Sequence, residues 1–385
     1  MYITTFYDGV AIHRAGKIIY GRFLEPHLVL STCRVAGGMR RGLGYVLNHQ
    51  SCEPCNHGRR LALRDPERYR REICAPHGLP PEQCATMGTA ANMHHAAFVR
   101  ESFRDLEVGA VITGGVETNA GRAGDPASVH ETADGFIRLD RPQAAAGEPA
   151  PGTINIMLFI GQPLTEAALT RSIITATEAK TAALQELAVN SRYSDGLATG
   201  TGTDQIIVAA PDRDGFRLGW AGKHSKLGEL IGRVVLAGVK EALAKQNRLT
   251  PMGQCSARIH LERFGCSRQS LRQGIADHLE GETAEVLKEN IDVIIRDPLV
   301  VAAVAAMVHL RDKIAWGILP SSCRQDIMAA AAAQLACALS GRYDLAASYR
   351  DALAGAASHA DNRRFLALCH RAMALGFADK WADGA

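Results

Sequence analysis

The fold class is decided by residues 153–187, which read TINIMLFIGQPLTEAALTRSIITATEAKTAALQEL. Residues 153–160 form a short apolar run bounded by turn residues, which is typical of a strand. Residues 165–187 are the clearest helix of the chain, because apolar residues recur there at helical spacing along one stripe. Together the two segments favour an α/β fold.

Working outward, further strand candidates are residues 9–13, 17–20, 27–32, 108–113 and 205–209, and 227–243 is the next helix. After about residue 225 the chain becomes rich in Ala and Leu, and residues 326–339 and 364–374 are typical of helices. We therefore expect an α/β domain over residues 1–248, with a mixed sheet and flanking helices. An α-helical C-terminal region follows over 249–385, and the proline at 251 marks the joint. Residues 121–151 lack periodicity and predict a loop beside a site.

Composition excludes several classes of protein. The 385 residues are 47% hydrophobic and 22% charged, with a net charge of +3, which is ordinary for a soluble protein and too weakly basic to indicate a nucleic-acid partner. The longest apolar run, residues 298–310, is too short to span a bilayer and predicts a buried helix. The first residues lack the apolar run of a signal peptide, and the ten cysteines are scattered, so we expect a cytoplasmic protein. The Ala-rich helices after residue 300 could pack on the first domain or form the surface of a homo-oligomer.

Two Gly-rich stretches carry candidate site residues next to predicted strands. In the first, Glu117, Asn119 and Asp125 could supply a base, an amide-recognising group and an orienting carboxylate, although a turn with side-chain caps explains them equally well. In the second, Thr201 and Thr203 alternate with glycines and offer hydroxyls to an oxygen-rich ligand. Asp204 ends this second stretch, where it is either a catalytic base or a turn cap, and Asn155 in the strand 153–160 is a further candidate for substrate binding.

The helix over residues 165–187 places Lys180 within its apolar stripe and Glu178 roughly on the opposite face. An amine on an apolar face must reach solvent, pair with a carboxylate or serve a site, because burying it alone is costly. We treat Lys180 as a candidate catalytic residue and Glu178 as a candidate binding residue.

The run Lys223-His224-Ser225 begins the predicted helix 227–243, with Ser225 as its N-cap. Cations at the positive end of a helix dipole are mildly unfavourable, and a bound anion or developing oxyanion would offset them. His224 is the best candidate for proton transfer, because its ordinary pKa is close to neutrality.

Four potential metal ligands lie close together in the segment NHQSCEPCNH, residues 48–57. His49, Cys52, Cys55 and His57 are of the types that bind zinc, and two of them have C-x2-C spacing. Structural zinc sites usually draw their ligands from two segments, so ordinary thiols in a polar loop explain the run better than a divalent metal does.

The order of these stretches carries a resemblance more specific than any one of them. NHQSCEP, ATMGTAANM, TGGVETNAGRAGDPA, GTINIMLFIGQPLT, TATEAKTAALQEL, SRYSDGLATGTGTD and AGKHSKLGELIG occur in this order between about residues 30 and 245. This order resembles the adenosylcobinamide amidohydrolase family. The region after about residue 250 is not part of the resemblance.

The resemblance implies hydrolysis of the amide that joins aminopropanol to the corrin ring of adenosylcobinamide, giving adenosylcobyric acid in cobamide salvage. Adenosylpseudocobalamin is a second substrate in some members, and the cobalt arrives with the corrinoid. Such chemistry needs a base, for which Glu117 or Asp204 are candidates, an acid such as His224, and oxyanion donors such as Lys180, Lys223 or the amides near Ser225. Neither G-x-S-x-G nor H-E-x-x-H occurs in the chain. A non-catalytic corrinoid-binding protein, or a phosphate- or nucleotide-binding enzyme using residues 223–225, are the alternatives.

Overall fold

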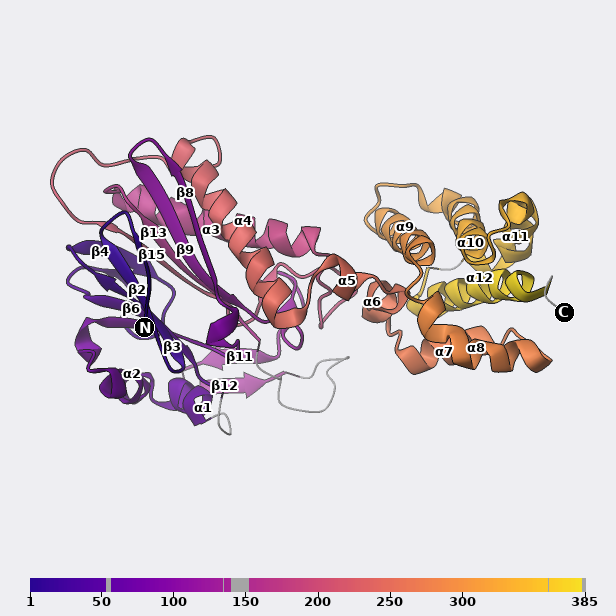
Figure 1. Cartoon of the computed structure of the whole chain (residues 1–385), viewed down its shortest axis with the longest axis horizontal. Coiled ribbons are helices and arrows are strands. Elements are labelled where there is room, and N and C mark those ends of the chain that lie inside the picture. Colours follow the sequence, from indigo (N-terminus) through magenta and orange to yellow (C-terminus); the bar gives the residue numbers. More distant parts are fainter. Residues whose placement is uncertain (53–56, 134, 140–151, 359, 383–385) are drawn as a thin grey trace. The chain divides into compact units, whose positions relative to one another are not determined.

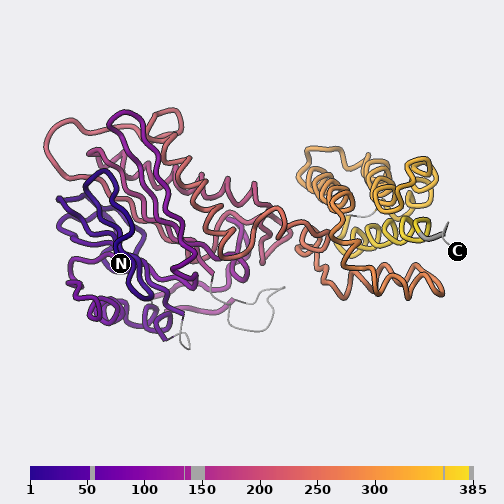
Figure 2. The backbone as a smooth tube through the Cα atoms, viewed as in Figure 1, coloured from indigo at the N-terminus to yellow at the C-terminus, as the bar shows by residue number. Residues whose placement is uncertain are grey.

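The computed structural model describes residues 1–52, 57–133, 135–139, 152–358 and 360–382. Its contacts divide the chain into two compact units, Met1–Leu249 and Thr250–Ala385. The backbone passes from the first unit to the second just after helix α4 (Lys226–Asn247), where Arg248 adopts a left-handed conformation with φ 55° and Thr250 caps the next short helix (Figure 2). The expected class, an α/β fold with a mixed sheet followed by a helical C-terminal region, is confirmed.

The first unit contains two main sheets. The five-stranded sheet, called here the N-terminal sheet, pairs its strands in the order β1-β2-β3-β6-β7. All neighbours in it are antiparallel except β6 and β7, which are parallel. Its strands are β1 (Tyr2–Phe6), β2 (Val10–Ala15), β3 (Ile18–Phe23), β6 (Tyr45–Gln50) and β7 (Cys84–Thr89).

The six-stranded sheet, called here the central sheet, has the order β5-β4-β15-β13-β9-β8. Its one parallel pair is β13 with β15, and the other neighbours are antiparallel. Its strands are β4 (His27–Ser31), β5 (Gly38–Arg40), β8 (Ala97–Phe103), β9 (Leu106–Gly114), β13 (Ile154–Ile160) and β15 (Gln205–Pro211).

The two sheets pack face to face and helices cover their outer faces, which gives four layers in the order α/β/β/α. Side chains such as Phe6, Val111 and Phe159 fill the space between the sheets. Helices α3 (Glu166–Glu186) and α4 pack on the central sheet (Figure 1), and the short helices α1 (His57–Arg64) and α2 (Pro66–Cys74) pack on the N-terminal sheet. Because β13 lies between two layers, all seven of its residues are buried, which explains its continuous apolar run.

Close packing between the sheets requires a glycine at residue 109. A β-carbon there would lie 2.4 Å from Cδ1 of Phe6, closer than two carbon atoms can approach. The bare backbone of β9 therefore makes room for a phenyl ring that is 1% exposed. This contact ties β1 of one sheet to β9 of the other.

The structure differs from the expectation at two places. Residues 48–50, for which no strand was predicted, belong to the buried strand β6. The segment 121–151, predicted as a loop, contains a hairpin of β11 (Val129–Thr132) and β12 (Gly135–Arg138), and residues 140–151 lie outside the described part. A separate short ladder pairs β10 (Ala120–Gly121) with β14 (Gly200–Thr201). These strands escape prediction because they are short or carry polar side chains.

The second unit is helical. Its apolar core lies among helices α6 to α12, and α9 is the buried helix expected from residues 298–310. A buried ion pair joins Arg263 to Asp312. Its helices are α5 (Pro251–Gln254), α6 (Ala257–Leu261), α7 (Arg268–Ala276), α8 (Gly281–Ile294), α9 (Pro298–Ala315), α10 (Arg324–Ser340), α11 (Ala346–Leu353) and α12 (Asn362–Ala382). Over the described residues of the chain, we find no helix with the length and apolarity needed to cross a bilayer.

Candidate functional site

A pocket of about 560 Å³ opens in the first unit where strand ends of both sheets meet. Ser51, Gly88 and Thr89 line it from the carboxyl ends of β6 and β7, and Thr153 and Gln205 line it from the amino ends of β13 and β15. Further walls come from α1 and α2, from the turn before β15 and from the segment after β9. Functional groups commonly gather on such loops beside a rigid scaffold.

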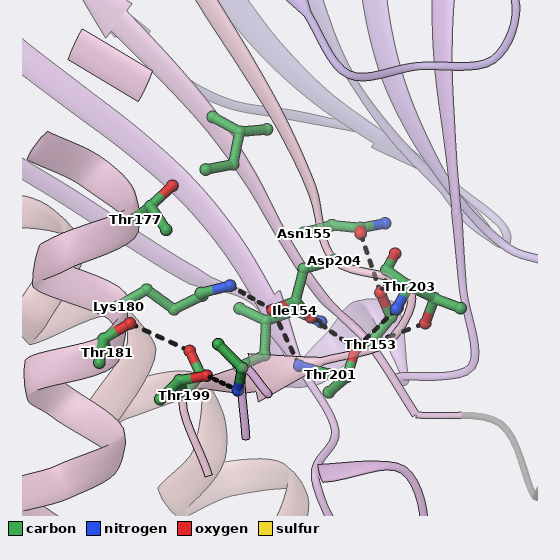
Figure 3. Close-up of polar contacts among 12 residues, drawn as sticks. Thr153, Ile154, Asn155, Thr177, Lys180, Thr181, Thr199, Thr201, Thr203 and Asp204 are labelled. Atoms are coloured by element: carbon green, nitrogen blue, oxygen red, sulfur yellow. Dashed lines mark hydrogen bonds and ion pairs between the residues drawn. The ribbon is translucent and has the colours of Figure 1, made fainter. Parts of the chain in front are cut away.

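Asp204 forms the most heavily bonded point of the pocket wall. It pairs with the ammonium of Lys180 from α3, and the two side chains are 10% and 7% exposed. The backbone amides of Ile154 and Thr201 donate to its two carboxylate oxygens at 2.8 and 3.0 Å, and the Thr201 hydroxyl donates at 2.6 Å (Figure 3). Four donors therefore surround the Asp204 carboxylate, which suits it to hold the pocket wall.

Gly200 makes this buried pair possible. A β-carbon at residue 200 would lie 2.4 Å from Oδ2 of Asp204 and 2.7 Å from Nζ of Lys180. The alternation of Thr and Gly in residues 199–204 thus has a packing reason besides its supply of hydroxyls.

A second hydrogen-bonded group surrounds Gly152, whose carbonyl oxygen accepts from Nδ2 of Asn119 at 2.9 Å and from the hydroxyl of Thr203 at 2.8 Å. The Tyr193 hydroxyl donates to Oδ1 of Asn119 at 2.8 Å. All four of these residues line the pocket. The structure thus brings together Asn119, Thr203 and Asp204, three of the residues predicted from the Gly-rich stretches.

Asn155 lies beneath the pocket and is completely buried between the sheets. Its Nδ2 donates to Oδ1 of Asn48 at 2.9 Å and to the carbonyl oxygen of Gly88 at 3.0 Å, and Nδ2 of Asn48 donates to the Thr113 hydroxyl at 2.8 Å. This chain of amides joins β6 and β7 to β13 and β9. Asn155 therefore supports the floor of the pocket and is not one of its lining residues.

Two hydroxyl side chains, Ser51 at the end of β6 and Tyr69 of α2, form the other polar side of the pocket, and His49 contacts Tyr69 from outside it. The Tyr69 hydroxyl of α2 lies 2.7 Å from Nδ1 of His49 and also interacts with the Ser51 hydroxyl. Burial lowers the pKa of His49 to about 4, and the positive charge of Lys17 adds to this effect. Burial raises the pKa of Tyr69 well above its ordinary value. The imidazole and the phenol are therefore both uncharged at neutral pH.

Residues 223–225 do not line this pocket. Nζ of Lys226, in the first turn of α4, lies 4.8 Å from the ring centre of Phe103 at the end of β8, whereas Oδ1 of Asn247 in the last turn accepts from the backbone of Val116 beyond β9. The helix thus begins at the end of the central sheet that is remote from the pocket. Ser225 caps α4 as predicted, by accepting from the backbone of Gly228 at 3.1 Å.

The remaining predicted residues of the site are dispersed. His224 is exposed at the start of α4, and Lys223 donates to Oε2 of Glu178 at 2.6 Å on the outer surface. Glu117 is exposed after β9 and does not line the pocket. Asp125 accepts from the Ser191 hydroxyl at 2.6 Å. Burial alone would raise the pKa of Asp125, but hydrogen bonds from its serine neighbours outweigh burial and lower it.

The predicted metal ligands are separated in the part of the chain that the structure describes. Cys52 lines the large pocket, whereas His49 and His57 line a separate cavity of about 220 Å³ on the other side of Tyr69. Nε2 of His57 lies 3.8 Å from a carboxylate oxygen of Glu72, and Cys55 lies outside the described residues. Among the described residues we find no group of three His, Cys, Asp or Glu side chains placed to hold a metal.

Sequence reasoning missed Ser51, Tyr69 and Tyr193 as pocket residues. Ser51 and Tyr193 lie inside two of the quoted motifs, so their place in the motif order was an available signal. Tyr69 lies in the charged run PERYRREIC of α2, where only the tertiary packing of that helix brings it to the pocket.

A family model and one named relative give the same family. The model of the family described as adenosylcobinamide amidohydrolase matches residues 3–251, which contain the whole pocket. An uncharacterised protein of Methanocaldococcus jannaschii is 39% identical over 190 residues, which cover 47% of this chain and 71% of that protein. A protein of Methanosarcina mazei named adenosylcobinamide amidohydrolase is 37% identical over 100 residues, which cover 24% of this chain and 46% of that protein.

Proposed function

Because the chain belongs to the adenosylcobinamide amidohydrolase family, we propose that it hydrolyses the amide between aminopropanol and the corrin ring of adenosylcobinamide. The products are adenosylcobyric acid and aminopropanol, and the reaction serves cobamide salvage. The observation that carries the proposal is the family match over residues 3–251, which spans all the strands that build the pocket. Adenosylpseudocobalamin is proposed as a second substrate, and the cobalt in either case belongs to the substrate.

The pocket suits an amide substrate because its walls present many neutral hydrogen-bonding groups, beside the cationic side chains of Arg34 and Arg59. Asn119, Tyr193 and Thr203 offer amide and hydroxyl groups that can orient amide side chains of a corrinoid. Asp204, the one carboxylate lining the pocket among the described residues, is held by four donors. We assign Asp204 and Lys180 the task of fixing the wall near residues 201–203, in place of direct proton transfer.

We place the reaction in a reducing compartment, the cytoplasm. The nine cysteines that the structure describes are all free thiols, which supports this assignment. No step of the proposed reaction passes through a bound metal, since the described candidates for metal ligands are divided between two cavities.

The test is a hydrolysis assay with the purified full chain and adenosylcobinamide. Released aminopropanol and adenosylcobyric acid are measured by mass spectrometry, with and without a chelator, and elemental analysis of the same sample measures its metal content. Equal amounts of both products, formed at the same rate with chelator, support the proposal. If the corrinoid binds without release of aminopropanol, the chain is a corrinoid-binding protein and the proposal fails.

Control variants test where the chemistry occurs. His224→Ala and Glu117→Gln change residues that lie outside the pocket, so we expect them to keep more than half of the wild-type rate. Thr203→Val removes a hydroxyl that lines the pocket and donates to Gly152 at 2.8 Å. We expect this change to raise KM. A large loss of rate in His224→Ala would instead place the reaction at the start of α4.

A further inference from the structure

Gly88 leaves an open space in the pocket that two hydroxyl groups border. A β-carbon at residue 88 would lie 3.2 Å from the Tyr69 hydroxyl oxygen and 3.3 Å from the Ser51 hydroxyl oxygen. All three residues line the large pocket. A ligand atom resting on the bare backbone of Gly88 therefore faces two hydroxyl donors at once.

Both hydroxyls are held in place by their surroundings. Ser51 is 5% exposed, its backbone amide donates to the carbonyl oxygen of Thr89 at 2.8 Å, and its own carbonyl oxygen accepts from Arg59 at 2.9 Å. Tyr69 is 4% exposed, and its hydroxyl is fixed by Nδ1 of His49 at 2.7 Å. Donors fixed before the substrate arrives need no reorganisation during the reaction, which is the condition for efficient stabilisation of an oxyanion.

We propose that the Ser51 and Tyr69 hydroxyls, converging over Gly88, form the oxyanion-binding pair for the carbonyl oxygen of the amide that is cleaved. His49 is a positioning residue, because it orients the Tyr69 hydroxyl without touching the substrate. The inference deepens the proposed function and rests on it. It assigns catalytic roles to Ser51 and Tyr69, and a positioning role to His49.

The role follows from the electron movements of amide hydrolysis. Water adds to the carbonyl carbon and loses a proton, and the C=O π pair moves onto the oxygen that contacts both hydroxyls. When the pair returns, the C–N bond breaks, its electrons stay with nitrogen, and that nitrogen takes up the proton, so acid and amine are released. The negative charge on oxygen exists only between the two steps, so donors aimed at it lower the barrier more than they strengthen substrate binding.

The hydroxyls and the imidazole provide this stabilisation without any charge of their own. His49 carrying its proton on Nδ1 donates to the Tyr69 oxygen and leaves the phenolic proton for the pocket. The Ser51 hydroxyl interacts with the Tyr69 hydroxyl beside it, and it donates to the Thr89 carbonyl oxygen at 3.3 Å. This is a long hydrogen bond that an oxyanion can outcompete.

The experiment compares Tyr69→Phe, Ser51→Ala and Gly88→Ala with two matched controls. Tyr20→Phe removes a hydroxyl from a tyrosine that packs on the same apolar cluster but does not line the pocket. Gly232→Ala adds a methyl group where no atom beyond its chain neighbours and the adjoining backbone of α4 lies within 4 Å. Rates and KM are measured for release of aminopropanol, and corrinoid binding is followed by its visible absorbance.

We expect kcat to fall by about 10²–10³-fold in Tyr69→Phe and in Ser51→Ala with KM changed less than threefold, as for loss of one oxyanion donor. Gly88→Ala fills the space and should lower kcat similarly, while both controls keep the wild-type values. For His49, Asn can replace the Nδ1 donor, so His49→Asn should retain more of kcat than His49→Ala.

Two results would overturn the inference. One is a wild-type kcat in Tyr69→Phe. The other is a covalent acyl group on Ser51 detected by mass spectrometry during turnover, which would make Ser51 a nucleophile. If the wild type binds the corrinoid and releases no aminopropanol, the proposed function fails. The inference then falls with it, because no oxyanion forms without hydrolysis. A wild type that releases aminopropanol, together with a Tyr69→Phe variant that does so at the same kcat, refutes the inference and leaves the proposed function standing.

Discussion

Replacing Lys180 by Met tests the buried ion pair that holds the pocket wall. Met keeps roughly the length of the side chain, but it removes the ammonium that faces Asp204. The Asp204 carboxylate then stays in a site where it is 10% exposed, with three of its four donors. The change therefore measures what the charge of Lys180 contributes.

The magnitude follows from the burial of the pair. Removing one partner of a buried ion pair costs about 3–5 kcal/mol, because the other charge is left unpaired. Since three hydrogen-bond donors to Asp204 remain, we expect the free energy of unfolding to fall by the lower end of this range, about 3 kcal/mol. At a urea slope of about 2–3 kcal/mol per molar for a unit of this size, the unfolding midpoint falls by about 1 M.

The assay is urea unfolding of the full chain. Hydrogen exchange of the backbone amides of β13 and β15 serves as the readout, so that unfolding of the first unit is observed by itself. Lys223→Met is the matched control, since Lys223 pairs with Glu178 at 2.6 Å but the two side chains are 60% and 45% exposed. Exposed pairs contribute about 0–1 kcal/mol, so this variant should unfold close to the wild type.

A double-mutant cycle completes the test. Lys180→Met with Asp204→Asn removes both charges, so its loss should be smaller than the sum of the single losses by about 1–3 kcal/mol. Equal losses for the Lys180 and Lys223 variants would refute the reasoning, and so would additive losses in the cycle. Since Asp204 anchors the backbone of Thr201, we also expect Lys180→Met to raise KM for the corrinoid.

Three further outcomes are expected. Gly109→Ala forces a β-carbon to 2.4 Å from Phe6, so overpacking should destabilise the first unit by about 1–3 kcal/mol. The control Gly232→Ala should leave the stability unchanged. Equal stability of the two variants in urea would contradict this prediction. Leu335→Ala empties a fully buried position of α10 and should cost about 2–5 kcal/mol in the second unit, measured by hydrogen exchange of α10, with kcat unchanged. Burial lowers the pKa of His370 to about 4, so its folded state prefers the neutral ring. Above a pH of about 6.5, the pKa of the imidazole in the unfolded chain, this preference costs no stability. As the pH falls towards 4, the unfolded chain binds the proton more readily than the folded one, so the free energy of unfolding decreases. The decrease is about 2 kcal/mol between pH 7 and pH 5. A His370→Gln chain whose urea stability falls as steeply as that of the wild type over this range would disprove the assignment.

The elements that the sequence predicted correctly have a one-sided or continuous apolar pattern. β13 is buried on both faces and α3 on one stripe, and Thr165 caps α3 by accepting from Ala168 at 3.2 Å. β6 escaped prediction because its last three residues, Asn48, His49 and Gln50, are polar. Asn48 and Gln50 are nevertheless buried, so their burial depends on partners in other strands that no local pattern reveals.

The site was predictable only where its residues lie in Gly-rich turns next to predicted strands. Asn119, Thr203 and Asp204 lie in Gly-rich turns that the strand ends bring together, so their clustering was expected. His224 has suitable chemistry, but α4 begins at the end of the central sheet that is remote from the pocket. Only the tertiary structure fixes the direction in which α4 runs along the sheet. The converse holds for Tyr69. Nothing in the sequence marks it as a site residue, but the packing of α2 places it in the pocket wall.

The amides of Asn48 and Asn155 set the alignment of the two sheets. Apolar faces slide past each other at little cost, because their attraction has no direction. A shift of one strand by two residues would keep the alternation of side chains but would leave both amides without partners in a dry interior, where each unmet group costs about 1–3 kcal/mol. The carbonyl oxygen of Gly88 belongs to the same set of bonds. The same alignment of the sheets that pairs these amides also brings strand ends of both sheets together at the pocket. A polar contact buried below the pocket therefore determines the pocket's shape.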